Sequence, residues 1–339
     1  MINDANLTSY IESVPRLHLG NFPTPLQLMP RLAAALDGSA VYVKRDDSSG
    51  FGGGGNKVRA LEYIMPEAMN RDADVLVTAG VVQSNSARQV AAAAARVGMG
   101  CHVLMVTDRV SGTDTDYAET GNVFLGHLFG ATFEPISIHD NREQRLRAAV
   151  DRLKRQGRTP YVVPYGCSNQ LGATGYLHAA LEIAHQVEMI GVGLTHVVHA
   201  SGTGGTQAGL IAGFAALDLG IEVIGIDVDA DPVGVRRRVN TRLTELTEAL
   251  GLPPMPDRVE IDSGYSAGAY GVADDAVVEA IRMGARLEAL LLDPVYSGKG
   301  LAGLIGLTRA SYFRPDAQVL FLHTGGEPAL FAHRSLFTT

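Results

Sequence analysis

The clearest chemical signal in the sequence is a lysine that follows a run of glycines. Residues 52–55 are all glycine, and Asn56 and Lys57 come next, at the start of a helix-like segment. Glycines lack Cβ atoms, so a planar or anionic group can approach their backbone closely. A cation in a first helical turn opposes the helix dipole, so Lys57 suits a neutral amine or one that bonds covalently to a carbonyl carbon. Asn56 and Val58 exclude a nucleotide phosphate loop, which needs Gly before the Lys and Ser or Thr after it. The alternative is a flexible surface loop with a solvated lysine.

A second glycine-rich turn has the composition of a phosphate-binding loop. Residues 201–206 read Ser-Gly-Thr-Gly-Gly-Thr and lie between an apolar run and a helix-like segment. Backbone N–H groups and hydroxyls at a helix N-terminus bind phosphate. A dinucleotide fingerprint would need glycine where Gln207 stands. Asp227 follows the next apolar run, where a ribose-binding acid would lie, so an NAD-dependent enzyme stays a weaker alternative. Another alternative is a tight strand-to-helix turn that binds no ligand.

Further polar side chains gather in two loops and two tyrosine segments. Residues 83–86 read Gln-Ser-Asn-Ser, and residues 323–326 read His-Thr-Gly-Gly after the last apolar run. One polar residue suffices to cap the helix that follows 83–86, and three exceed that need. Tyr270 and Tyr296 lie beside or near a glycine, where a phenol can act as an acid, a base or a stacking face. The alternative for residues 83–86 is a simple helix cap, and for residues 323–326 it is an ordinary turn that ends a strand. The alternative for the two tyrosines is half-buried packing without a chemical role.

These loops fall between alternating strand-like and helix-like segments. Short apolar runs predict buried strands at 41–43, 75–78, 102–106, 161–163, 195–199, 223–226 and 319–322. Longer segments predict helices at 58–70, 86–97, 142–156, 173–187, 206–217, 276–289 and 300–310. This alternation predicts an α/β protein with mostly parallel sheets and helices on both faces. In such folds ligands bind where strand C-termini meet helix N-termini, which is where the polar loops lie.

Composition narrows the class of protein. The chain has 339 residues, 46% of them hydrophobic, which predicts a large globular core or two lobes. A formal net charge of −8 argues against a nucleic-acid-binding surface. The sequence has neither an apolar run long enough to span a membrane nor a secretory signal, and only two cysteines, Cys101 and Cys167. We therefore expect a cytoplasmic protein without disulfides, membrane contact or nucleic-acid partner.

Neither histidines nor cysteines predict a metal or thiol site. His196 and His199 lie three apart on a predicted strand and so point to opposite faces. Cys167 has no histidine near it in the sequence, and we interpret it as a small buried residue rather than a nucleophile.

One lysine, one phosphate loop and several hydroxyls suit pyridoxal 5′-phosphate (PLP) better than a nucleotide. The sequence resembles the fold-type II PLP enzymes related to tryptophan synthase β, in the branch of D-cysteine desulfhydrase, L-cysteate sulfo-lyase and 1-aminocyclopropane-1-carboxylate (ACC) deaminase. The segments that carry the resemblance are FPTPL at 22–26, KRDD at 44–47, GGNK at 54–57, QSN at 83–85, GTGGT at 202–206, DPVYSGK at 293–299 and HTGG at 323–326. They follow the family's order over nearly the whole chain.

The resemblance implies a set of site residues. The implied catalytic residues are Lys57, Ser84, Tyr270 and Tyr296. The implied cofactor-binding residues are Lys57, Asn85, Gly202, Thr203, Gly204, Gly205, Thr206, Thr324 and Gly325. The implied substrate-binding residues are Ser84, Asn85, Ser86 and Tyr270. No metal ligand is implied.

Each implied role has a chemical content. Lys57 corresponds to the lysine that binds the PLP aldehyde, and Asn85 to the partner of the phenolic oxygen of PLP. Ser84 corresponds to the residue near the substrate carboxylate and α-carbon. Thr324 corresponds to a neutral hydroxyl that faces the pyridine nitrogen, and it would leave that nitrogen largely unprotonated, which favours β-elimination.

The resemblance also implies an architecture. Two open, twisted, mostly parallel sheets are expected, one in a large PLP-binding domain (residues 1–59 and 165–339) and one in a small domain (residues 60–164). The small domain would close over a small amino-acid substrate and exclude water. A homodimer is expected from the family.

The expected reaction is an α,β-elimination that breaks a carbon–sulfur bond. ACC deaminases have Glu after the tyrosine of the DPVY segment, whereas this chain has Ser297, which makes ring-opening deamination the less favoured alternative. D-Cysteine desulfhydrases usually have His after the QSN triplet, whereas this chain has Ser86. A small hydroxyl there would accommodate a sulfonate, so L-cysteate stays beside D-cysteine as a substrate. A PLP-binding protein without catalysis is a further alternative.

Overall fold

The computed structural model describes residues 4–36, 40–111 and 113–338. The strands are β1 (Leu26–Leu28), β2 (Ala40–Arg45), β3 (Val75–Val81), β4 (Gly100–Val106), β5 (Ala131–Ile136), β6 (Pro160–Val162), β7 (His196–Ser201), β8 (Glu222–Asp227), β9 (Glu260–Asp262) and β10 (Gln318–His323). The α-helices are α1 (Ala5–Ser13), α2 (Pro30–Ala35), α3 (Lys57–Asn70), α4 (Asn85–Arg96), α5 (Gly121–Leu128), α6 (Arg142–Arg155), α7 (Gln170–Met189), α8 (Gly205–Ala216), α9 (Pro232–Leu250), α10 (Asp275–Glu288), α11 (Ser297–Arg309) and α12 (Glu327–Leu330).

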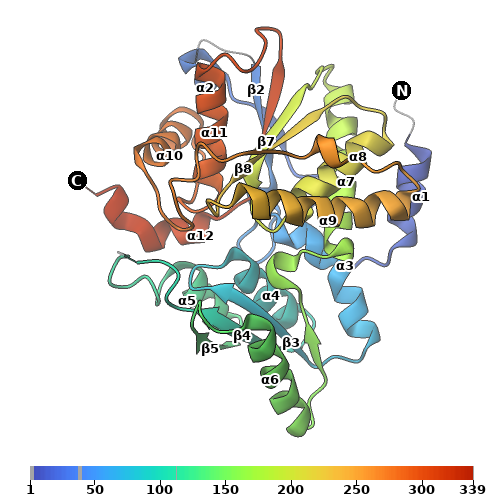
Figure 1. Ribbon diagram of the computed structural model, residues 1–339, viewed down its shortest axis with the longest axis vertical. Helices are drawn as coiled ribbons and strands as arrows, with labels where there is room; N and C mark the ends of the chain where they lie inside the picture. Colours follow the sequence, from blue (N-terminus) through green and yellow to red (C-terminus); the bar gives the residue numbers. More distant parts are fainter. Residues whose placement is uncertain (1–3, 37–39, 112, 339) are drawn as a thin grey trace.

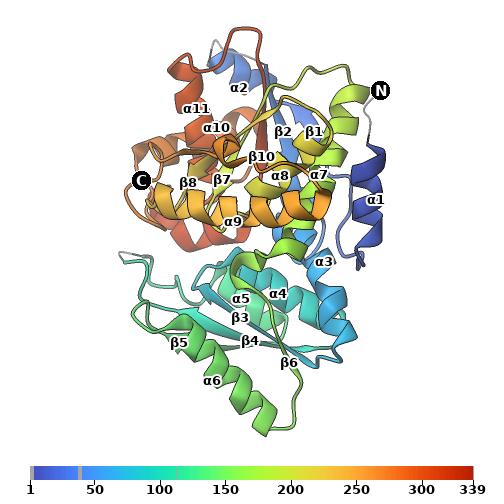
Figure 2. The same cartoon turned by 45° about the vertical axis from the view of Figure 1, so that its right-hand side comes forward.

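The two sheets form two lobes, stacked one above the other in Figure 1. The large lobe contains a six-stranded sheet in the order β1-β2-β10-β7-β8-β9, in which only the β1–β2 pair is antiparallel (Figure 2). One hydrophobic cluster joins this sheet to α1, α7, α8 and α9, and another joins it to α2, α10 and α11. Helices therefore cover both faces of the sheet.

The small lobe contains a parallel four-stranded sheet in the order β5-β4-β3-β6. Its central strand β3 is buried along its whole length. Residues of α3 and α4 pack with β3 and β4 in one cluster, and Ala149 of α6 packs with Val81 and Leu104 in another. The helices are therefore split between the two faces, as a parallel sheet requires.

The structure confirms the predicted α/β class with two mostly parallel sheets, and each predicted strand and helix corresponds to an observed one. The predicted boundaries after residues 59 and 164 stay predictions; residues 1–3, 37–39 and 339 of the predicted large domain and residue 112 of the small one lie outside the described part. Several short elements and the long helix α9 were not predicted. Among them, β5 contains Pro135 and is an edge strand, where a missing N–H is tolerated.

The C-terminal ends of the parallel strands carry the loops singled out by the sequence. Residues 83–86, 202–206 and 323–326 lie at the ends of β3, β7 and β10, respectively, and the first two run into the first turns of α4 and α8. In the described part of the chain, no helix combines the length and apolar character needed to cross a bilayer.

Candidate active site

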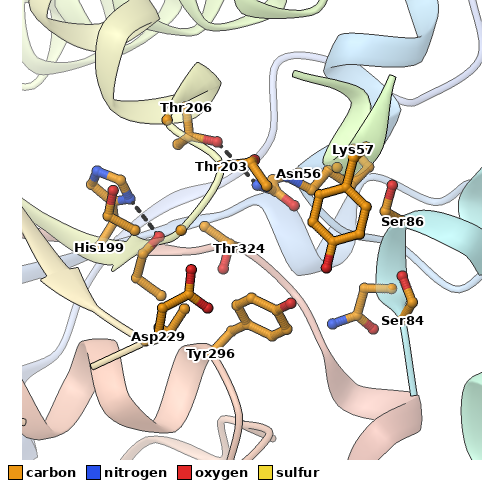
Figure 3. Close-up of a pocket in the computed structure, with 18 of the residues that line it drawn as sticks. Asn56, Lys57, Ser84, Ser86, His199, Thr203, Thr206, Asp229, Tyr296 and Thr324 are labelled. Atoms are coloured by element: carbon orange, nitrogen blue, oxygen red, sulfur yellow. Dashed lines mark hydrogen bonds between the residues drawn. The ribbon is translucent and has the colours of Figure 1, made fainter. Parts of the chain in front are cut away.

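A pocket lined by both sheets' strand-end loops brings most of the predicted residues together (Figure 3). The predicted residues that line it are Lys57, Ser84, Asn85, Ser86, Gly202, Thr203, Gly204, Thr206, Tyr270, Tyr296 and Thr324. Two predicted residues lie behind this wall: Gly205 faces the Ser168 side chain, and Gly325 packs against Gly55.

Lys57 is the lysine that the fold directs to the pocket. The sequence contains four lysines, all in the described part of the chain. Lys44 is paired with Glu182, Lys299 donates to backbone carbonyl oxygens, and Lys154 is exposed on α6. Lys57 begins α3 and lines the pocket. Burial lowers the pKa of its amine, with Cys167 acting in the opposite direction, so a neutral nucleophilic amine is more accessible than on a surface lysine.

The glycine run before Lys57 is held in place by close contacts with Asp47 and Arg88. Gly54 has φ +70°, and a Cβ there would lie 1.7 Å from the carbonyl oxygen of Asp47. Arg88 of α4 donates to the Gly54 carbonyl oxygen at 2.9 Å and also to that of Gly52. The alternative of a flexible surface loop is therefore wrong, because the run is anchored to the small lobe by a buried arginine.

The loop predicted to bind phosphate connects β7 to α8 through Gly204. Gly204 is the N-cap of α8, has φ +91°, and a Cβ there would lie 2.8 Å from the α9 backbone at Arg238 and Val239. The first N–H groups of a helix have no partners within the helix, so they are available to an anion. Asn56 donates from Nδ2 to the Thr206 hydroxyl at 3.1 Å, which ties this loop to the loop of Lys57.

We expect Gly204→Ala to weaken binding of PLP to the apoprotein about tenfold or more. Alanine at this left-handed position is strained by roughly 1 kcal/mol or more, and its Cβ would push the loop off α9. The dissociation constant is measured by absorbance titration with PLP. Gly220→Ala is the matched control, because a Cβ there meets no atom within 4 Å. Equal dissociation constants for Gly204→Ala and wild type would contradict the assignment of the loop.

Ser84, Asn85 and Ser86, which follow β3, each make a different contact. Ser84 is the N-cap of α4 and accepts from the Ala87 N–H at 3.1 Å, so the capping alternative is correct for Ser84, although Ser84 also lines the pocket. The Asn85 Oδ1 accepts from the Asn122 Nδ2 at 2.8 Å. The Asn85 Nδ2 is therefore left as the donor, as a partner of a phenolic oxygen would need. Ser86 lies 3.4 Å from the Cys167 sulfur.

Two tyrosines form a hydrogen-bonded pair in the pocket wall. The Tyr270 and Tyr296 hydroxyls lie 2.7 Å apart, with the rings in an edge-to-face arrangement. Burial raises the pKa of both phenols well above the usual value, so both are protonated at neutral pH. The Arg109 guanidinium lies 4.0 Å from the centre of the Tyr270 ring and pairs with Asp229 at 3.1 Å. The two phenols are therefore hydrogen-bond donors, and the Arg109 guanidinium lies over the Tyr270 ring.

Ser297 does not face the pocket. Its hydroxyl donates to the Asp293 carboxylate at 2.7 Å, and that carboxylate also accepts from the N–H groups of Val295, Tyr296 and Ser297. The buried Asp293 carboxylate thus binds the backbone of the segment before α11 and fixes the position of Tyr296, the N-cap of this helix.

Asp227 gives no support to a nicotinamide site. Its carboxylate is buried at the end of β8 and accepts from the Asp229 N–H at 2.7 Å. Gln207, which interrupts the dinucleotide pattern, has its side chain bonded to the Ser201 hydroxyl and the Glu260 carbonyl oxygen. Gln207 is thus bonded within the protein, and the buried Asp227 does not line the pocket, so neither fits a ribose-binding role.

Sequence reasoning missed several pocket residues. Arg109, Tyr165, His199 and Asp229 also line the pocket. Burial lowers the pKa of His199 to about 4, so its ring is neutral. Their place in the sequence could have indicated Arg109 and Asp229, because both follow soon after β4 and β8, at the strand ends where parallel sheets bind ligands.

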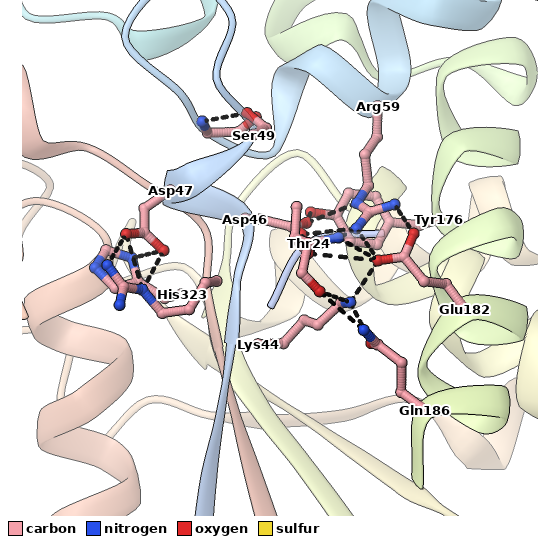
Figure 4. Close-up of polar contacts among 12 residues, drawn as sticks. Thr24, Lys44, Asp46, Asp47, Ser49, Arg59, Tyr176, Glu182, Gln186 and His323 are labelled. Atoms are coloured by element: carbon pink, nitrogen blue, oxygen red, sulfur yellow. Dashed lines mark hydrogen bonds and ion pairs between the residues drawn. The ribbon is translucent and has the colours of Figure 1, made fainter. Parts of the chain in front are cut away.

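A buried ionic cluster supports the start of α3 from below (Figure 4). Arg59, two residues after Lys57, donates to Asp46 at 2.8 Å and to Glu182 at 2.9 Å. Lys44 pairs with the same Glu182. Burial alone would raise the pKa of the Glu182 carboxyl, but Arg59 and Lys44 lower it to about 2. The cluster therefore joins β2, α3 and α7 near the N-terminus of α3, where Lys57 lies.

We expect Glu182→Gln to lower the free energy of unfolding by about 3–5 kcal/mol, because it leaves the buried Lys44 ammonium without its carboxylate partner and leaves Arg59 with Asp46 alone. Urea unfolding at pH 7 measures the change. The Glu182 pKa is depressed, so its contribution is complete above roughly pH 4.3 and is lost as the pH falls towards about 2. Glu143→Gln, which breaks an exposed pair with Arg147, is the control and should change little. Equal effects of the two variants would contradict the role of the cluster.

Comparison with known proteins identifies the family. The family model for pyridoxal-phosphate dependent enzymes matches residues 17–325. The chain belongs to this family. It is 41% identical over 324 residues to a D-cysteine desulfhydrase of Salmonella newport (strain SL254), covering 96% of this chain and 98% of that protein. PLP is therefore its cofactor.

Solved structures support the same assignment. A crystal structure of an ACC deaminase homologue superposes with a TM-score of 0.86 and 33% identity, over 96% of this chain and 95% of that one. The apo form of Escherichia coli diaminopropionate ammonia lyase superposes with a TM-score of 0.67 at 18% identity, covering 98% of this chain and 90% of that one, which shows the shared fold.

The pocket residues fit PLP chemically. The cofactor needs an amine for its aldehyde, N–H groups for its phosphate and a donor for its phenolic oxygen. Lys57, the loop from Gly202 to Thr206 and the free Nδ2 of Asn85 supply these groups around one pocket. The close approach of Gly204 to α9 leaves no room for a side chain where the phosphate loop turns.

Proposed function

We propose that the protein is a PLP-dependent carbon–sulfur lyase that acts on D-cysteine and yields pyruvate, hydrogen sulfide and ammonia. The observation that carries the proposal is the pocket that holds both a lysine amine of lowered pKa and a pair of protonated phenols. The similarity to the D-cysteine desulfhydrase supports the choice of substrate.

When bound, PLP withdraws electrons from the amino-acid α-carbon and makes its proton removable. The role of this chain is to hold the substrate and to move protons. The N–H groups at the start of α4, beside Ser84, suit the substrate carboxylate. The Lys57 amine accepts the α-proton, for which its lowered pKa keeps a larger neutral fraction.

Protonation assists the departure of the sulfur. As the carbon–sulfur bond breaks, the sulfur takes the electron pair, and a phenol of the Tyr270–Tyr296 pair donates the proton that completes hydrogen sulfide. Water then converts the three-carbon remainder to pyruvate and ammonia. Arg109 stabilises the phenolate that is left behind, because its guanidinium lies over the Tyr270 ring.

The contact between Arg109 and Asp229 closes the pocket. Arg109 lies in the loop after β4 of the small lobe, and Asp229 follows β8 of the large lobe. Arg238 of α9 holds the same aspartate at 2.6 Å. This bridge limits the access of water during the reaction.

L-Cysteate is the second candidate substrate, with sulfite as the leaving group. It is favoured by the Arg109 cation in the pocket and by the small Ser86 side chain. The ACC deaminase alternative is less favoured, because Ser297 provides no carboxylate and its hydroxyl is bonded to Asp293.

The test is a product assay on the purified PLP-loaded protein with D-cysteine, L-cysteine, L-cysteate and ACC. Pyruvate with sulfide from D-cysteine supports the proposal. Sulfite from L-cysteate as the faster reaction moves the assignment to the second substrate. 2-Oxobutyrate from ACC, without sulfide from cysteine, would overturn it.

We also propose that the protein is a homodimer, as the family resemblance implies, and that it is cytoplasmic. Its two cysteines are buried and unpaired, which suits a reducing compartment. Sedimentation equilibrium measures the mass, and a monomer at micromolar concentration would contradict the dimer. Fractionation of the native cell tests the location.

A further inference from the structure

A buried lysine outside the pocket has its ammonium enclosed by backbone carbonyl oxygens. Lys299 lies in the first turn of α11 and has a relative exposure of 0%. Its Nζ donates to the carbonyl oxygens of Ser266 at 2.6 Å, Ala269 at 2.8 Å and Val228 at 3.3 Å. These bonds use all three N–H groups of an ammonium.

The position is unfavourable for a lysine that has no specific role. A cation in the first turn of a helix opposes the helix dipole. Burial lowers the pKa of Lys299 to about 8, against the opposing effect of Asp227 and Asp229. A buried apolar side chain would avoid both costs, so the three carbonyl oxygens explain why a cation is present.

Two of the three carbonyl oxygens, those of Ser266 and Ala269, belong to the segment that leads into Tyr270. Ala269 directly precedes Tyr270, in a loop where Ala267, Gly268 and Gly271 all have positive φ. Such a loop has no regular hydrogen-bonding pattern to fix it. Lys299 itself follows Tyr296 by three residues, so one ammonium joins the two tyrosine segments.

The third carbonyl oxygen connects the same ammonium to the bridge between the lobes. Val228 follows β8 and precedes Asp229, the partner of Arg109. Lys299 therefore contacts the segment before Tyr270 and the segment before Asp229 without itself lining the pocket.

We propose that Lys299 is a positioning residue that acts as an internal cation and keeps the Tyr270 and Tyr296 hydroxyls in hydrogen-bonding contact. The inference rests on the proposed lyase function and names what fixes its proton donors. Carbonyl oxygens that converge on one point are also ligands for K⁺. Removal of the side chain therefore leaves a site that a free monovalent cation of suitable size can occupy.

The test uses the PLP-loaded Lys299→Ala variant. We expect kcat with the best substrate to fall at least about tenfold, with a smaller change in KM and with the PLP absorbance retained. Addition of KCl or NH4Cl should restore kcat and raise the Tm of this variant. Tetramethylammonium chloride at equal ionic strength should do neither, because it is too large and has no N–H donor. Wild type and the exposed control Lys154→Ala should not respond to the choice of cation.

Two results would overturn the proposal. One is a wild-type kcat in Lys299→Ala, and the other is a loss of kcat together with a Tm that neither cation changes. Lys299→Met, which fills the space without a charge, covers the case in which the alanine variant does not fold. We expect kcat of Lys299→Met to fall and not to change when KCl or NH4Cl is added. A wild-type kcat in this variant would also contradict the proposal. The Tm response needs no substrate, so it tests the cation even if the lyase function fails.

Discussion

Replacement of Lys57 by alanine is expected to abolish turnover, with a loss of roughly 10⁴-fold or more in kcat. Lys57 is the lysine that lines the pocket, whereas the other three are paired, enclosed or exposed. Without it, the aldehyde has no amine in the pocket and the substrate α-proton has no base. The yellow absorbance of lysine-bound PLP should disappear as well. Product assays and absorbance spectra of the two proteins measure both effects.

The matched control for this variant is Lys154→Ala, because Lys154 is exposed on α6. It should keep wild-type kcat and absorbance. Thermal unfolding separates a chemical defect from a folding defect, since α3 should persist on its support from Arg59. Lys57→Ala protein that still shows the absorbance and turns over substrate would contradict the assignment of this lysine.

Replacement of Tyr296 by phenylalanine is expected to lower kcat for cysteine by about 10²–10⁴-fold. The ring stays in its edge-to-face contact with Tyr270, but the 2.7 Å hydroxyl pair is lost. If the pair protonates the leaving sulfur, the loss should depend on the leaving group. β-Chloro-D-alanine releases chloride, which needs no proton, so its elimination should fall much less than that of D-cysteine.

Steady-state kinetics of wild type, Tyr296→Phe, Tyr270→Phe and the double variant complete this test. Because the two phenols share one hydrogen bond, the second substitution should cost less than the first. Equal losses for cysteine and β-chloro-D-alanine would show that the pair does not act on the leaving group.

Local sequence patterns predicted the parts of the fold that local physics decides. Buried parallel strands such as β3 and β10 appear as apolar runs, because helices cover both faces of their sheets. Lys57 was found because a lysine in a first helical turn after a run of glycines is electrostatically unfavourable without a chemical role, and Gly204 because glycines and hydroxyls in a strand-to-helix turn suit a phosphate. The structure adds that Gly204 approaches α9 so closely that a Cβ is excluded. Ser84 shows that a helix cap and a pocket residue can be the same side chain.

Contacts between distant segments could not be predicted in this way. The pairing of Arg109 with Asp229 joins loops of different lobes, and either residue alone looks like a solvated surface charge. The same holds for Lys299, whose partners are backbone carbonyl oxygens that leave no trace in the side-chain pattern. Helix α9 was missed although it begins at an Asp231 cap and ends at Gly251, since its charged surface masks the narrow buried stripe.

The most direct test of the site is to trap the cofactor on its lysine. Reduction of the PLP-loaded protein with borohydride fixes the bond between PLP and the lysine amine, and peptide mass spectrometry then locates the modified residue. The pocket geometry predicts one modified residue, Lys57, in stoichiometric amount. Stoichiometric modification of Lys44, Lys154 or Lys299, or none at all, would contradict it.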